Sequence, residues 1–195
     1  MRLGIAHHLG WAVAVTASTD HDVVDRRRIE LIEEGLPAAP IHHMGGTHAM
    51  HDTGGPPLDD RALAALVDDV RASVRRAASA ALDELSAASP EPIVSISVRA
   101  WPDDFPTDIA VVRHPPYESR VDSIMYCQLL AELARARNWD VHTYDARTVE
   151  ARAADVLGAR ADDVLHGPRS RLGAPWSKDH RMALAATVLA EHTDG

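Results

Sequence analysis

The stretch that decides the fold runs from residue 3 to residue 16 and reads LGIAHHLGWAVAVT. It holds two apolar, partly alternating segments on either side of a Leu9-Gly10 turn, as expected for two β-strands. A third segment rich in β-branched residues follows at 23–32, after the polar turn 18–22. Short strands joined by short turns pair with their neighbours in sequence. The stretch therefore predicts a three-stranded antiparallel meander.

Beyond the meander, helices and strands are predicted to alternate. Apolar residues at helical spacing, from Leu63 through Val74 to Leu85, predict a helix over 59–88 that ends before Pro90. The elements predicted after it are a strand at 93–98, a helix at 119–138, a strand at 141–144, a helix at 149–157 and a helix at 177–191. The predicted helix caps are Ser119 with Asp122, Thr148 and Ser177. This order indicates one α/β domain over 1–195, with a mixed sheet, flanking helices and a His/Gly/Pro-rich loop at 35–58.

Composition limits the partners that the chain is expected to have. Its 195 residues are 46% hydrophobic and carry a net charge of −9, which argues against indiscriminate binding to a phosphate backbone. No apolar run is long enough to span a membrane and no signal-peptide pattern is present, so we expect a cytoplasmic protein with no membrane partner. Cys127, the single cysteine, lies in an apolar helical stretch and is expected to be buried.

Three short strings resemble the RuvC branch of the RNase H-like superfamily. Leu3-Gly-Ile-Ala followed by Gly10-Trp-Ala-Val is similar to the opening of RuvC-type resolvases. The string 141–150 resembles their fifth strand and the segment after it, and 178–186 resembles their final helix. The resemblance implies an RNase H-like five-stranded mixed sheet, a phosphodiester hydrolase of the nuclease type, a nucleic-acid partner, Mg²⁺ or Mn²⁺ as cofactor, and a homodimer.

The acidic residues of that family are mostly missing here. In RuvC-type enzymes four acids hold two divalent metals, which activate water for attack on a phosphodiester. Carried over by position, the first acid falls on Ala6, one falls near Arg99 and one on Met182, and Asp179 alone matches. Two Mg²⁺ ions need several hard oxygen ligands, which one carboxylate does not supply. The sequence therefore predicts a protein without standard two-metal nuclease chemistry.

A cation-lined cleft is predicted in place of the metal site. The fold would bring His7 or His8, Arg99, Lys178, Asp179 and His180 together. His7, Asp179 and His180 are the candidate catalytic residues, for proton transfer without the two metals. The candidate ligand-binding residues are Arg99, Lys178, Trp101, Arg169 and Arg171, with Trp101 as a stacking surface. Each of these residues also has an ordinary structural interpretation, such as a helix-start charge, a core histidine or a core aromatic.

A second candidate site lies in the loop 35–58. Its residues His42, His43, His48 and His51 carry imidazoles, which bind Zn²⁺ or Ni²⁺, although their spacing matches no standard zinc site. Three functional hypotheses follow. The chain is a divergent RuvC-like protein whose cationic cleft binds a phosphate-bearing or nucleic-acid partner, a non-catalytic dimerising assembly module, or a hydrolase with altered histidine or transition-metal chemistry.

Overall fold

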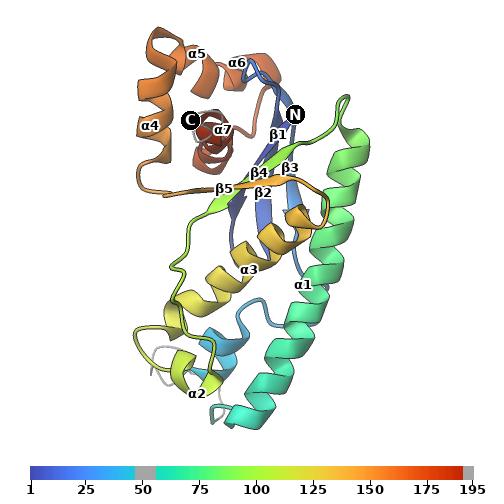
Figure 1. The fold of residues 1–195 in the computed structure, drawn as a ribbon, viewed down its shortest axis with the longest axis vertical. Coiled ribbons are helices and arrows are strands. Elements are labelled where there is room, and N and C mark those ends of the chain that lie inside the picture. Colours follow the sequence, from blue (N-terminus) through green and yellow to red (C-terminus); the bar gives the residue numbers. More distant parts are fainter. Residues whose placement is uncertain (47–55, 191–195) are drawn as a thin grey trace.

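The protein folds into a five-stranded mixed sheet with helices on both faces, as the computed structural model of residues 1–46 and 56–190 shows (Figure 1). The strands are β1 (Arg2–His7), β2 (Trp11–Ala17), β3 (Val23–Glu30), β4 (Ser95–Arg99) and β5 (Asp140–Tyr144). Their order is β3-β2-β1-β4-β5, with antiparallel β1–β2 and β2–β3 pairs and parallel β1–β4 and β4–β5 pairs. The predicted α/β class, the mixed sheet and the antiparallel meander are confirmed.

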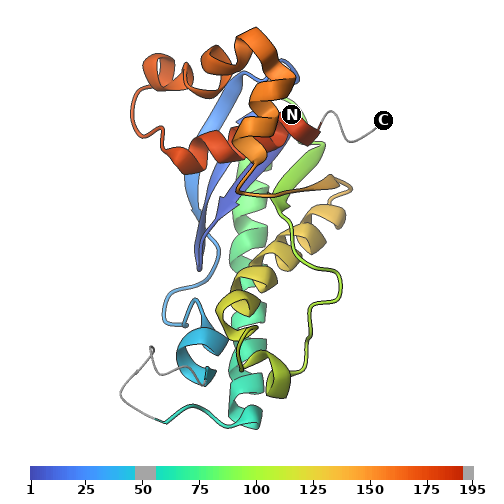
Figure 2. The ribbon, with the colours of Figure 1, turned by 90° about the vertical axis from the view of Figure 1, so that its left-hand side faces the viewer.

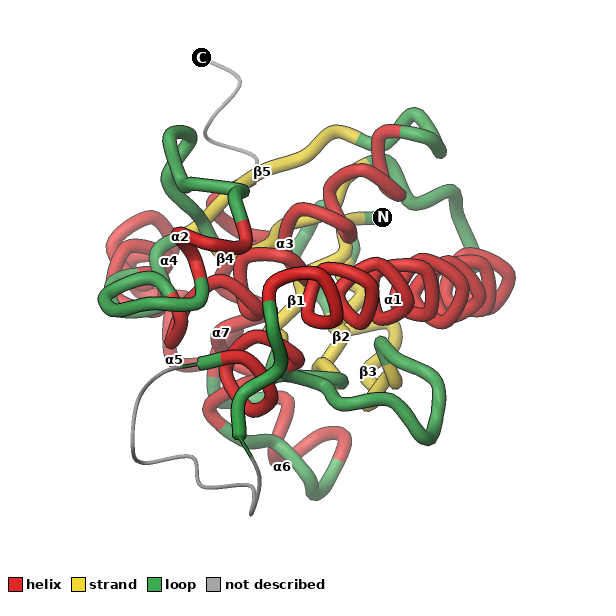
Figure 3. Tube along the Cα trace, turned by 90° about the horizontal axis from the view of Figure 1, so that it is seen from below, coloured by secondary structure: helices red, strands yellow, loops and turns green. Residues whose placement is uncertain are grey.

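The helices form two layers and a small lobe. They are η1 (Ile41–Gly45, one π-helical turn), α1 (Asp60–Ala88), α2 (Ile109–Val112), α3 (Glu118–Arg135), α4 (Val149–Leu157), η2 (Gly158–Arg160), α5 (Ala161–Leu165), α6 (Pro168–Leu172) and α7 (Lys178–Ala190). α1 and α3 lie side by side on one face of the sheet, and α4 to α7 cover the other (Figures 2 and 3). No helix in the described ranges is both long enough and apolar enough to cross a membrane.

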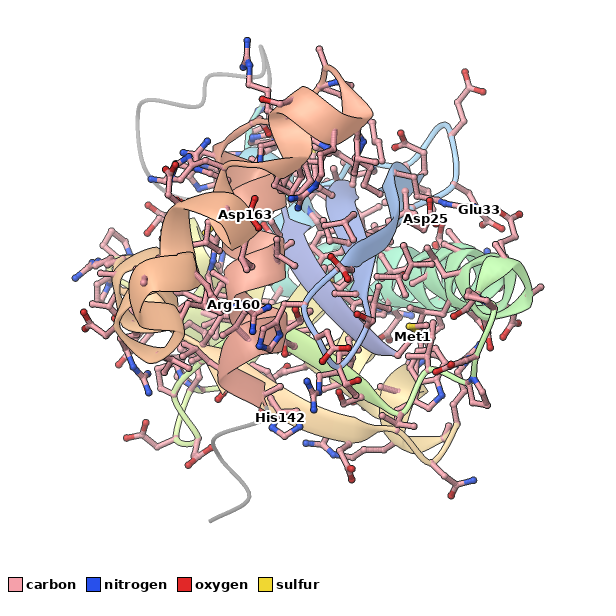
Figure 4. The ribbon with its side chains drawn as sticks, turned by 90° about the horizontal axis from the view of Figure 1, so that it is seen from above. Met1, Asp25, Glu33, His142, Arg160 and Asp163 are labelled. Atoms are coloured by element: carbon pink, nitrogen blue, oxygen red, sulfur yellow. The ribbon has the colours of Figure 1, made fainter. Side chains whose placement is uncertain are left out.

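The central strands are buried on both faces because alternate residues enter different cores. On β1, Leu3 and Ile5 join the core under α1 and α3, whereas Ala6 joins the core under α7. This alternation is the strand period of two. Gly4, between them, lies directly against the backbone of α7 at Ala183. Seen from above, Asp25 on β3 and His142 on β5 mark the two edges of the sheet (Figure 4).

A smaller lobe extends beyond the sheet, where η1, α2 and the first turns of α1 and α3 meet (Figures 1 and 2). Its core is small: Ile41, Leu63 and Val112 are buried, and six apolar side chains that pack on them stay partly exposed. The predicted loop 35–58 contributes the η1 turn to this lobe, while residues 47–55 lie outside the described residues.

Two predicted helix caps are wrong. α3 begins at Glu118 and has no side-chain cap within the described structure, so Ser119 and Asp122 form no capping box. The Asp122 carboxylate is buried instead and accepts the backbone N–H groups of Ile41 (3.3 Å) and His42 (2.9 Å). Thr148 stands at the start of α4 without a side-chain cap among the described residues. A local pattern cannot reveal that Asp122 is needed by a turn 80 residues away.

Candidate functional site: a cationic pocket at the ends of β4 and β5

An open pocket of about 660 Å³ lies at the carboxyl ends of the parallel strands β4 and β5. Ligands of open α/β sheets commonly bind outside this end of the strands. β4 ends at Arg99 and β5 at Tyr144, and the loops that follow them form two walls. Arg120 of α3 and Lys178 of α7 complete the lining. The lining residues are Arg99, Ala100, Trp101, Pro102, Arg120, Tyr144, Asp145, Ala146, Arg147 and Lys178.

The pocket carries an excess of positive charge. Four cations line it, Arg99, Arg120, Arg147 and Lys178, against the single carboxylate of Asp145. Over the described ranges none of the four forms an ion pair, whereas eight other arginines do: Arg27, Arg28, Arg75, Arg76, Arg113, Arg137, Arg171 and Arg181. The Nε atom of Arg99 is buried and has no hydrogen-bond partner there. Such a buried donor calls for an acceptor.

The predicted binding residues divide into two groups. Arg99, Lys178 and Trp101 meet in this pocket. Arg169 and Arg171 lie on α6 outside it, and Arg171 is paired with Asp163 at 2.9 Å. The two further cations of the lining, Arg120 and Arg147, were not among the predicted residues. Arg147 could have been found, because it follows β5 as Arg99 ends β4, and parallel strands end at the same edge.

His7 is buried and is not part of the lining of the pocket. It is 2% exposed, its Nε2 is 2.9 Å from Ser123 Oγ, and Cys127 Sγ lies 3.5 Å from the same nitrogen. Burial, followed by the charges of Arg99 and His8, lowers the pKa of His7 to about 3. The ring is therefore neutral near pH 7. Burial also raises the pKa of Cys127 to about 12, so its thiol stays protonated as expected of a buried cysteine.

Asp179 pairs with His8 rather than with His7 or His180. Its Oδ2 lies 3.0 Å from His8 Nε2, and both side chains are partly exposed. The His8 ring stacks on Trp11 at 4.1 Å, and the Arg28 guanidinium lies over the same indole at 4.1 Å. These contacts occupy Trp11 within the protein. Trp101 lines the pocket and is partly buried against the main core.

His180 takes part in the start of α7. Its Nδ1 accepts the backbone N–H of Ser177 at 3.2 Å and lies 2.8 Å from Ser177 Oγ. A third-position side chain that reaches back to the residue before the helix is half of a capping box. Burial, followed by the charge of Arg26, lowers the pKa of His180, which keeps Nδ1 available as an acceptor. The structure brings His7, Asp179 and His180 into three separate sets of contacts.

We expect His180→Ala to destabilise the fold by about 1 kcal/mol, because it removes this cap. His180→Gln should retain most of the stability, since a glutamine at the third position can make the same bond. Urea unfolding of both variants tests this. Equal losses would contradict the capping role.

The side chains near the pocket do not fit a pair of divalent metals. Ala6 and Met182 are buried apolar residues, Arg99 is a cation, and Asp179 is paired with His8. Within residues 1–46 and 56–190 no three His, Cys, Asp or Glu side chains are grouped as metal ligands would be. In the His-rich loop, the rings of His42 and His43 lie 5.3 Å apart on η1, while His48 and His51 lie outside the described residues.

No family model, no curated protein and no solved structure matches this chain. The function is therefore inferred from the residues of the pocket themselves. Their arrangement can bind a group with several negative charges, since arginine offers paired N–H donors and lysine a mobile point charge. A flat group beside the anion would find the ring of Trp101 in the same pocket.

Proposed function

We propose that this protein binds a phosphate-bearing partner in the pocket between β4, β5, α3 and α7. The observation that carries the proposal is the convergence of four cations without ion pairs to described residues on one open pocket. With a net charge of −9, the chain repels polyanions in general, so binding would be confined to this place. A phosphate group accepts several hydrogen bonds at once and matches the arginine fork.

The order of the strands supports a place among RuvC-like proteins of the RNase H-like superfamily. An antiparallel meander followed by two parallel strands is the sheet that the resemblance implies. In this proposal the metal-binding acids have been replaced, with Arg99 at the end of β4 where the family has an acid. The protein then binds a phosphate-bearing or nucleic-acid partner without two-metal cleavage. A dimerising role and transition-metal chemistry stay predictions of the sequence.

The test is binding of a short single-stranded oligonucleotide and of pyrophosphate, measured by fluorescence anisotropy and by calorimetry. We expect the Arg147→Gln/Lys178→Gln variant to lose at least about tenfold in affinity for both ligands. For the oligonucleotide, log K falls as log salt rises, and each lost phosphate contact should make this slope less steep by about 0.7. The charge-matched control is Arg61→Gln/Arg169→Gln, two exposed arginines outside the pocket that form no ion pair with a described residue.

Equal affinities for the wild type and the pocket variant would refute the proposal, as would an equal loss in the control variant. Trp101→Leu separates the two kinds of ligand. If a base stacks on Trp101, this substitution weakens binding of the oligonucleotide by about 1–3 kcal/mol and leaves binding of pyrophosphate unchanged. Cleavage of the oligonucleotide that requires Mg²⁺ and is abolished by Asp179→Ala would show that two-metal chemistry survives.

A further inference from the structure

A second pocket lies in the small lobe, away from the cationic pocket. Its closed part, about 80 Å³, lies between η1, α1, α2, α3 and the loop before α2. A more open part of about 300 Å³ continues from it. The residues that line both parts are Val67, Arg71, Thr107, Ile109 and Gln128. The lobe's core leaves this space unfilled although its walls are mainly apolar, which is typical of a small-molecule site.

The polar groups of this second pocket are unequally satisfied. The Arg71 guanidinium and the Gln128 amide form no hydrogen bond or ion pair with any residue that the structure describes. Asp122, at the closed end, already accepts two backbone N–H groups, one on each oxygen. Asp68, one turn before Arg71 at the open end, is exposed to solvent. The Arg71 guanidinium offers only donors, whereas the Gln128 amide offers donors and one acceptor, so the strongest group without a described partner where the two parts join is a cation.

We propose that this second pocket binds a compact apolar molecule that carries one carboxylate. The apolar body lies among Val67, Ile109 and Val121, and the carboxylate takes hydrogen bonds from Arg71 and Gln128 where the closed and open parts join. A guanidinium offers only donors, in a fork that matches a carboxylate. This site differs from the cationic pocket, although one loop contributes to both: Trp101 and Pro102 line the cationic pocket, and Phe105 lines the second.

The experiment uses three probes with the same eight-carbon chain: octanoate, 1-octanol and octylamine. Titrations of the isotope-labelled full chain, followed by amide and methyl NMR shifts, give the affinity and the place of binding. We expect octanoate to bind at least about tenfold more tightly than 1-octanol, with shifts at Val67, Ile109 and Val121. Arg71→Gln should remove this difference. Arg61→Gln, an exposed arginine on the same helix, should leave it unchanged.

Several results would overturn the inference. If Asp122 and Asp68 governed the site, octylamine would bind more tightly than octanoate, so that result refutes the inference. Equal affinity for octanoate and 1-octanol refutes the role of Arg71. Val121→Phe, which fills the space, should abolish binding while the melting temperature shows that the variant is folded. The cationic pocket is tested with different ligands and variants. A negative result for octanoate therefore does not refute the proposed phosphate binding, and a negative result for phosphate ligands does not refute the second pocket.

Discussion

Gly4→Ala is expected to cost about 3 kcal/mol or more of unfolding free energy, at the upper end of the range for overpacked cores. A Cβ atom at this position would lie 1.9 Å from the carbonyl oxygen of Ala183 and 2.6 Å from its carbonyl carbon. These are backbone atoms of α7, so no side-chain rotation can relieve the clash. Either β1 or α7 must move, and each is buried along most of its length. Urea unfolding of the variant and the wild type measures the loss.

Gly158→Ala is the matched control, because it adds the same methyl group in open space. Gly158 has φ of +54° and no heavy atom within 4 Å of the added Cβ. Its ψ is −125°, a backbone conformation that L residues rarely adopt, so the substitution should cost about 1–3 kcal/mol, and this cost should come from the backbone alone. A loss of less than about 1 kcal/mol in Gly4→Ala would refute the close approach of β1 and α7. A large loss at Gly4 alone would support the packing of α7 directly on the sheet.

The sheet could be predicted from the sequence because its strands have strong local patterns. The stretch 3–16 alternates between two cores, and Gly10, at φ of +85°, turns the chain between β1 and β2. The long helix α1 was equally visible, since its buried residues recur at helical spacing over 29 residues. The short helices α2, α5 and α6 were not predicted. Helices of four or five residues have too few turns for a periodic pattern to develop, and tertiary contacts hold them.

The cationic pocket could be predicted in part, for a topological reason. The sequence predicts that Arg99 and Lys178 lie together, because the ends of parallel strands and the start of the last helix meet at one edge of the sheet. Arg120 could not be found this way, since the packing angle of α3 decides which of its residues reaches the pocket. The sequence places Arg169 and Arg171 with the pocket only because they lie near Lys178 in the chain. Nearness in sequence is a poor guide here, because the two arginines lie on α6, a separate short helix that does not contribute to the pocket.

Burial shifts two titratable groups in directions that change stability with opposite sign. The pKa of His7 falls from 6.5 to about 3, so between these values the unfolded chain binds a proton that the native protein does not. Native stability is therefore lost as the pH falls below 6.5. The pKa of Asp122 rises from 3.8 to about 6, mainly through burial, so the native protein binds the extra proton between these values. That contribution increases stability as the pH falls from 6 to 3.8.

The contributions of His7 and Asp122 to stability overlap and nearly cancel around pH 5. Substituting one residue at a time should separate them. Relative to wild type, Asp122→Asn should lose about 1.4 kcal/mol more stability per pH unit between pH 5.5 and 4.5, because the His7 contribution then acts alone. His7→Gln should gain a similar amount of stability relative to wild type as the pH falls over the same interval. Urea unfolding at a series of pH values gives both slopes, and the other carboxyl groups cancel in the comparison with wild type. The unfolding free energy of the double variant, plotted against pH, should run parallel to that of the wild type. If the curve of a single variant ran parallel to that of the wild type, the substituted group would titrate in its ordinary range. That group would then not be held in the buried contact between β1 and α3, for His7, or between η1 and α3, for Asp122.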